Sequence, residues 1–207
     1  MALRIKTCLE LYDLYVFDNI KKLISEKIDE CKYIYAPDTK DIGFRYLQQR
    51  YGTQRIFPSV FVFRDSPPSI ADEEYSSVKY AIEFSEASSK LSFRNVNIYL
   101  DYNVSFVSDD VYDMNAFAIW YYNFRSYRKI RIDFNELGID FKNDFEVFLD
   151  NLEFENTIDN MFEEGLYFKY YFTFSVLFPL FDVKEEITYD KVVLSLYNKD
   201  ELKVRIE

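Results

Sequence analysis

Two long stretches of alternating side chains limit what this chain can fold into. In the first, the apolar residues Val96, Ile98, Leu100, Tyr102, Val104 and Phe106 alternate with mostly polar ones. Residues 166–180 repeat the pattern, with Leu166, Phe168, Tyr170, Phe172, Phe174, Val176 and Phe178 on one face. Successive side chains of a β-strand point to opposite faces, so each stretch predicts a strand with one buried face and one wet face. We expect these strands, 95–108 and 166–180, to pair at the centre of a sheet.

The first long strand leads directly into a predicted helix over 109–128. Ser108, Asp109 and Asp110 are residue types that cap helix N-termini by accepting hydrogen bonds from free backbone amides. The apolar residues Val111, Met114, Phe117, Tyr121 and Phe124 follow at helical spacing. We expect Trp120, Tyr121 and Tyr122 to pack in the core as part of this helix. Asp109, Asp110 and Asp113 together also suggest a metal cluster, but capping accounts for acidic residues at a helix start.

The remaining segments complete a predicted α+β domain. Residues 1–52 are predicted to form an N-terminal helical segment. Its second helix runs from a cap at Asp38 or Thr39 to Arg50. Its first helix has apolar residues at helical spacing, namely Leu11, Leu14, Tyr15, Ile20, Leu23, Ile24 and Ile28. Residues 3–5 fit either a helix or a strand. Shorter strands are expected at 60–63, 78–84, 129–134 and 192–196, and residues 143–154 favour a strand. Residues 129–134 alternate charged and apolar side chains, as an edge strand does. We therefore predict one domain over 1–207, with a mostly antiparallel sheet in 53–207 and helices packed on one face.

The chain contains no histidine, which excludes the commonest general base, the Ser-His and Cys-His dyads and most zinc sites. Its glycines are scattered singly, so no phosphate-binding loop is present. Cys8 and Cys31 are too few for a disulfide framework and are expected to be reduced thiols. The sequence Asp182-Val-Lys184 is similar to the acid-x-Lys element of some nucleases, but such a spacing arises easily by chance in a highly charged chain. We expect no catalytic activity, no cofactor and no metal.

The charge of the chain is strongly negative and unevenly distributed. A net charge of −11 is unsuited to gripping nucleic acid through its phosphates. No run approaches the roughly 18 apolar residues of a membrane helix, and charges near the N-terminus argue against a signal peptide. A basic cluster of Arg125, Arg128, Lys129 and Arg131 precedes an acidic block that includes Asp144, Glu146, Asp150, Glu153 and Glu155. Two oppositely charged surfaces on one chain are suited to head-to-tail self-association. The alternative is that both are solvated faces without a partner.

The order of segments resembles the tail-completion proteins of tailed bacteriophages, which are tail-terminator and sheath-stabilising neck subunits. The resemblance covers residues 55–197 and rests on a proline-containing strand (57–63), the strand 98–106, a helix opened by Asp109, a short strand (130–134) and the strand 166–180. It implies a structural virion protein that forms a ring, usually a hexamer, at the head-proximal end of the tail. Its partners would be copies of itself and other tail tube, sheath or neck proteins, with DNA at most passing through the lumen and no membrane. The family has no catalytic residues to transfer.

Two other functions remain open from the residues alone. One is a soluble non-catalytic adaptor that binds a single partner protein through the loop at 65–77. The other is a divalent-metal nuclease built on carboxylates. A virion subunit, assembled in the host cytoplasm, is the leading expectation.

Overall fold

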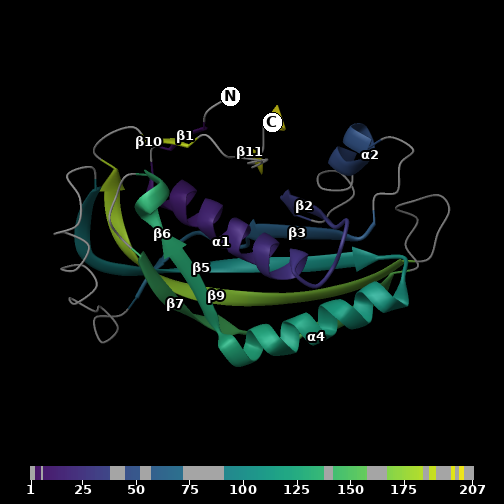
Figure 1. The fold of residues 1–207 in the computed structure, drawn as a ribbon. Helices are drawn as coiled ribbons and strands as arrows, with labels where there is room; N and C mark the ends of the chain where they lie inside the picture. The colour runs from purple at the N-terminus through teal and green to yellow at the C-terminus, as the bar shows by residue number, and fades with distance from the viewer. Residues whose placement is uncertain are drawn as a thin grey trace.

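Two long antiparallel strands, β5 (Leu91–Ser108) and β9 (Tyr167–Val183), form the centre of the structure (Figure 1). The structure is a computed structural model, and it describes residues 3–5, 7–37, 45–51, 57–71, 91–137, 142–157, 167–183, 187–189, 197–198 and 201–202. Val104 lies opposite Phe172 and Leu100 opposite Val176, so apolar residues of both strands share one face. A register shift between Phe93 and Asn97 interrupts the ladder. The predicted central pairing is confirmed, and both strands extend beyond the predicted limits.

An eight-stranded sheet is built around this pair in the order β2-β3-β5-β9-β7-β6. The flanking strands are β2 (Lys32–Tyr35), β3 (Ser59–Arg64), β6 (Lys129–Asp133) and β7 (Lys142–Leu149). Two further strands pair outside this path: β4 (Ser69–Ile70) with β5, and β8 (Glu153–Thr157) with β9. Within this sheet β2 and β3 are parallel, and the other pairs are antiparallel. The predicted edge position of 129–134 is confirmed, because β6 ends the sheet order.

Helices α1 (Cys8–Ser25) and α4 (Val111–Tyr127) cover the same face of the sheet (Figure 1). Tyr12 of α1 stacks on Phe178 of β9 with ring centroids 4.1 Å apart. Phe117 of α4 stacks on Phe106 of β5 at 4.4 Å. Since Phe106 and Phe178 belong to the aligned apolar sets of the two central strands, one continuous core lies beneath both helices. The predicted α+β class, with a mostly antiparallel sheet and helices on one face, is confirmed.

Both helices begin where the sequence supplies a cap. Thr7 accepts a hydrogen bond from the Glu10 amide, and the Glu10 side chain accepts one from the Thr7 amide, which completes a capping box for α1. The Asp110 side chain caps α4 by accepting from the Tyr112 amide at 2.8 Å. The Ser108 hydroxyl accepts from the Asp110 amide and donates to Asp113. Of the acidic residues predicted to cap α4, Asp110 is the N-cap, and Asp113 instead accepts from the Ser108 hydroxyl.

Several local predictions are wrong or incomplete. Val111 and Tyr122 are exposed, because the buried stripe of α4 runs through Met114, Phe117, Trp120, Tyr121 and Phe124. Residues 33–35 lie in strand β2, within the segment 1–52 that the sequence predicts to be helical. Residues 143–154 contain two strands, since β7 ends at Leu149 and β8 begins at Glu153.

The shorter elements lie around this core. Residues 3–5 form strand β1 (Leu3–Ile5), paired with β10 (Ile187–Tyr189), and β11 (Tyr197–Asn198) pairs with β12 (Glu201–Leu202). A 3₁₀ turn, η3 (Phe134–Leu137), follows β6. Helix α2 (Arg45–Tyr51) matches the end of the predicted second helix. The cap predicted at Asp38 or Thr39 and the strands predicted at 78–84 and 192–196 lie outside the described residues.

Candidate assembly surface

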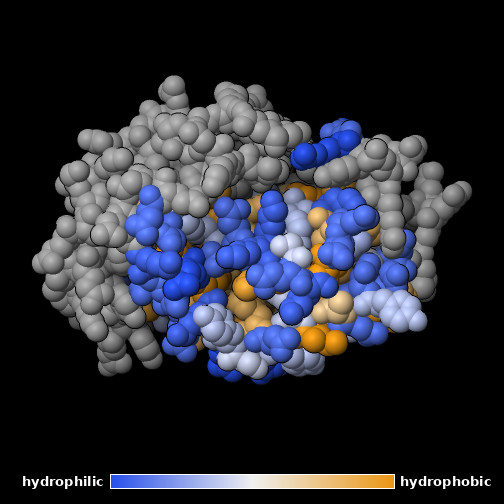
Figure 2. All heavy atoms as spheres, in the orientation of Figure 1, coloured by the Kyte–Doolittle hydropathy of each residue, from blue (hydrophilic) through white to orange (hydrophobic). Residues whose placement is uncertain are grey.

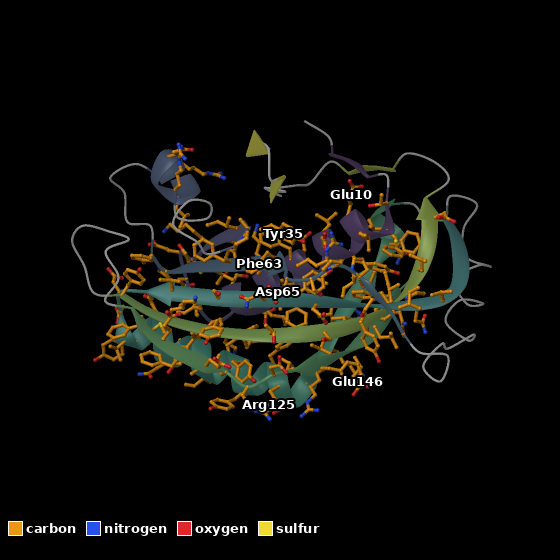
Figure 3. All side chains as sticks on the ribbon, turned by 180° about the vertical axis from the view of Figure 1, so that it is seen from behind. Glu10, Tyr35, Phe63, Asp65, Arg125 and Glu146 are labelled. Atoms are coloured by element: carbon orange, nitrogen blue, oxygen red, sulfur yellow. The ribbon has the colours of Figure 1, made fainter. Side chains whose placement is uncertain are left out.

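The basic cluster and the acidic block meet within one chain. Strands β6 and β7 form an antiparallel pair whose register places Lys129 opposite Glu146 and Arg131 opposite Asp144. The Arg131 Nε atom lies 3.2 Å from Asp144 Oδ1. Figure 3 shows Arg125 and Glu146 on the same side of the molecule. The hairpin register therefore turns two segments that are separate in the sequence into neighbours on one surface.

The remaining predicted charges also have partners inside the chain. On the face of β9 away from the helices, Lys169 pairs with Glu155 at 3.3 Å, Tyr171 donates to Glu153, and Thr173 donates to Asp150. At the end of α4, Arg125 donates to the Asn151 side chain and Arg128 donates to the Arg125 carbonyl. A contact between copies that used these side chains would compete with bonds that each chain already makes.

The outer face of α4 carries five of the eight large apolar side chains that are exposed among the described residues. Its large exposed side chains are Val111, Tyr112, Ile119, Tyr122 and Tyr127, with exposed fractions of 83% at Tyr112 and 63% at Ile119. The two charged residues of the helix, Asp113 and Arg125, are half-buried. Figure 2 shows orange and pale residues among blue ones along the lower part of the molecule, where α4 runs in Figure 1. Exposed aromatic residues with few charges are characteristic of protein interfaces.

A hollow lies beside this face, between the end of α1 and the second half of α4. Its volume is about 180 Å³. One wall consists of Leu23, Glu26 and Lys27, and the other of Trp120, Asn123, Phe124 and Tyr127. The floor is rigid because Trp120 and Phe124 stack with each other at 5.4 Å and contact Phe172 of the central strand. The hollow is therefore an aromatic depression with a polar rim.

Helix α4 is held firmly against the sheet, so its outer face has a defined shape. The Phe117 ring contacts Phe106, Trp120, Tyr170 and Phe172. The Tyr121 hydroxyl donates to the Asp150 carbonyl, and the Val147 amide donates to the Arg128 carbonyl just after the helix. Arg128 adopts a left-handed conformation with φ 49°, which ends α4 and directs the chain into β6. Such a fixed helix can present side chains to a partner with little loss of conformational entropy.

A buried polar cluster joins α1 to strands β3 and β5 of the sheet. Asp13 of α1 is 3% exposed, and its Oδ1 atom accepts a hydrogen bond from the Tyr102 hydroxyl at 2.9 Å. The Arg64 guanidinium lies 3.6 Å from the other carboxylate oxygen. Burial raises the pKa of Asp13 above its usual range, and Arg64 and Tyr102 only partly oppose this effect. Sequence reasoning missed this residue, although a single acid inside the apolar run from Leu11 to Phe17 was a visible signal.

The sites considered for catalysis give no metal-binding geometry in the described part of the chain. Within those residues, no group of three or more His, Cys, Asp or Glu side chains is placed to hold a metal ion. Asp182 lies exposed at the end of β9, and Lys184 is outside the described residues. The loop considered for an adaptor is described from Asp65 to Ala71, where Ile70 is 75% exposed.

None of the described helices is long and apolar enough to cross a membrane. A comparison with protein-family models gives no match for this chain, and neither does a comparison with curated protein sequences.

Proposed function

We propose that this protein is a non-enzymatic structural subunit that assembles with copies of itself. The resemblance to phage tail-completion proteins specifies the assembly: a ring, usually of six subunits, that completes the tail at the neck in the virion. The observation that carries the proposal is the uncharged, aromatic outer face of α4.

The charge of the chain favours a second copy as the occupant of this face. Each chain carries a net charge of −11, so two copies repel each other wherever acidic surfaces approach. On the outer face of α4, Tyr112, Ile119 and Tyr122 are exposed and carry no charge, so like charges do not meet there. A basic partner would be attracted instead to the acidic surfaces of β7 and β8.

The residue types on this face suit a stable contact. Tyrosine is enriched at interface hot spots because it buries a large apolar ring and keeps a polar tip. Tyr112, Tyr122 and Tyr127 supply three such rings on one helix. An acidic ring of such subunits would allow DNA to pass through its lumen without adhering.

The first experiment measures the oligomeric state. Native mass spectrometry and negative-stain microscopy are expected to show closed oligomers or rings, and purified virions to contain the protein. The double variant Ile119→Gln/Tyr122→Gln should shift the protein to the monomer, since both residues lie on the outer face of α4. Glutamine is a good helix former, so α4 itself should persist.

A matched control separates this surface from exposed apolar residues elsewhere. Ile70→Gln/Phe148→Gln changes two exposed side chains outside α4 and should leave the oligomer intact. A wild-type chain that stays monomeric at high concentration and is absent from purified virions would refute the proposal. If the two double variants affect the oligomeric state equally, the outer face of α4 is not the specific assembly surface.

A further inference from the structure

The hollow between α1 and α4 has the size and chemistry to take one aromatic ring. An apolar cavity of about 150 Å³ in another protein binds benzene. The hollow here measures about 180 Å³ and has apolar walls from Leu23, Trp120 and Phe124. Asn123 and the charged rim residues add hydrogen-bonding groups at its edge. A buried tyrosine needs an apolar surface for its ring and a polar partner for its hydroxyl, and this site provides both.

The best candidate to fill the hollow is on the same helix. Tyr112 is 83% exposed, the largest exposed fraction among the described large apolar residues. It lies eleven positions before Asn123, which corresponds to about 16 Å along the axis of an α-helix. The helix is rigid over this length, so Tyr112 cannot reach the hollow of its own chain.

We propose that Tyr112 of one copy inserts into the α1–α4 hollow of a second copy. This inference rests on the proposed self-assembly and identifies the pair of surfaces that make the contact. The projecting residue and the hollow occupy different places on the subunit, as a contact between two different surfaces requires.

The charges around the two surfaces are complementary. Asp109 and Asp110 precede Tyr112 at the start of α4. Glu26 and Lys27 on the rim of the hollow offset each other in charge. Arg128 and Lys129 directly follow Tyr127, which lines the hollow at the end of α4. Docking Tyr112 in a neighbouring hollow brings an acidic helix start towards a basic helix end. The local attraction between these acidic and basic groups opposes the repulsion between two chains that are both negatively charged overall.

The single tryptophan of the chain provides a direct readout. Trp120 lines the hollow and is the only tryptophan in the sequence, so its fluorescence reports on the site. As protein concentration rises, the emission of Trp120 should change, because a ring enters the hollow that Trp120 lines. Tyr112→Ser should abolish this change and weaken self-association about tenfold or more, as expected for a hot-spot residue. Tyr127→Phe, which keeps a ring in the wall, serves as the control.

Cross-linking identifies the two surfaces. Val111→Cys, at an exposed position that leaves the Tyr112 ring in place, and Asn123→Cys are mixed as single variants and treated with a short bismaleimide. The mixture should give a covalent dimer, whereas either variant alone should not. The native thiols compete little, because Cys8 is buried and burial raises the pKa of Cys31 to about 12. Phe148→Cys mixed with Asn123→Cys is the negative control.

The double variant Val111→Cys/Asn123→Cys separates this inference from the proposed ring. A ladder of cross-linked multimers supports both the contact and the ring. Cross-linking that stops at dimers supports the contact and overturns the ring. Oligomers without a 111–123 cross-link overturn the contact alone, and a monomeric chain without cross-links overturns both.

Discussion

The Asn19 side chain makes hydrogen bonds with both the backbone carbonyl and the backbone amide of Arg131, although the two residues are 112 positions apart. Its side-chain nitrogen donates to the Arg131 carbonyl at 2.6 Å, and its side-chain oxygen accepts from the Arg131 amide at 3.1 Å. Nearby, the Tyr15 hydroxyl donates to the Asp133 carbonyl. Two side chains of α1 thus occupy hydrogen-bonding positions along β6 that another strand would use. This arrangement protects the edge of the sheet from pairing with a second chain.

Replacing Asn19 by alanine should lower the free energy of unfolding by about 1–2 kcal/mol, because two hydrogen bonds to a half-exposed edge are lost. Urea denaturation measures the effect. Asn135→Ala, at an exposed position just after β6, serves as a control with little expected change. A loss no greater than that of the control would show that water replaces the amide without cost.

Asp13 should make stability depend on pH in a defined direction. Because its pKa is raised in the folded state, the folded chain binds a proton more tightly than the unfolded chain does. The stability of the wild type relative to Asp13→Asn should therefore fall as pH rises from about 4, the usual pKa of aspartate, through the raised pKa.

Urea denaturation of both proteins between pH 4 and 8 provides the measurement. Other titrating groups are common to both chains, so they largely cancel in the difference. A difference that does not vary with pH would mean that the carboxyl group titrates alike in the folded and unfolded states.

The Arg131–Asp144 pair should contribute little to stability. Arg131 is exposed, and such ion pairs are worth about 0–1 kcal/mol and weaken with salt. Arg131→Glu should destabilise the hairpin by a similar amount, because it places two acids opposite each other. The exchange Arg131→Glu/Asp144→Arg should restore stability.

Charge reversal also tests the expectation that Arg128 and Arg131 join copies through their charge. If they do, Arg128→Glu/Arg131→Glu should weaken assembly more at low salt than at high salt. Unchanged assembly at both salt concentrations would remove these residues from the contact.

Phe117→Ala should lower the free energy of unfolding by about 3–5 kcal/mol, the usual cost of removing a buried phenylalanine. Phe117 is fully buried and stacks on Phe106 beneath α4. Thermal and urea denaturation measure the loss. Phe148→Ala, at a half-exposed position, should cost much less.

The elements of this fold were largely predictable because their signals are local. The alternation of apolar and polar residues between 96 and 106 predicts a strand without any other information. Successive side chains of a strand point to opposite faces, so one face is apolar and the other polar. Ser108 to Asp110 specify the start of α4 through the chemistry of a few adjacent residues. The wrong assignments of Val111 and Tyr122 have a related cause. Both are apolar, and the sequence does not state which side of a helix faces the sheet.

Sequence alone therefore determined the strand and helix segments, the α+β class and the exclusion of histidine chemistry. Only the tertiary structure decided which distant residues meet: Asn19 with Arg131, Asp13 with Tyr102, and Arg131 with Asp144. It also decided that the exposed aromatic residues gather on α4 beside a hollow. The physical reason is that strand register and helix docking depend on packing summed over the whole core. No short segment contains that information.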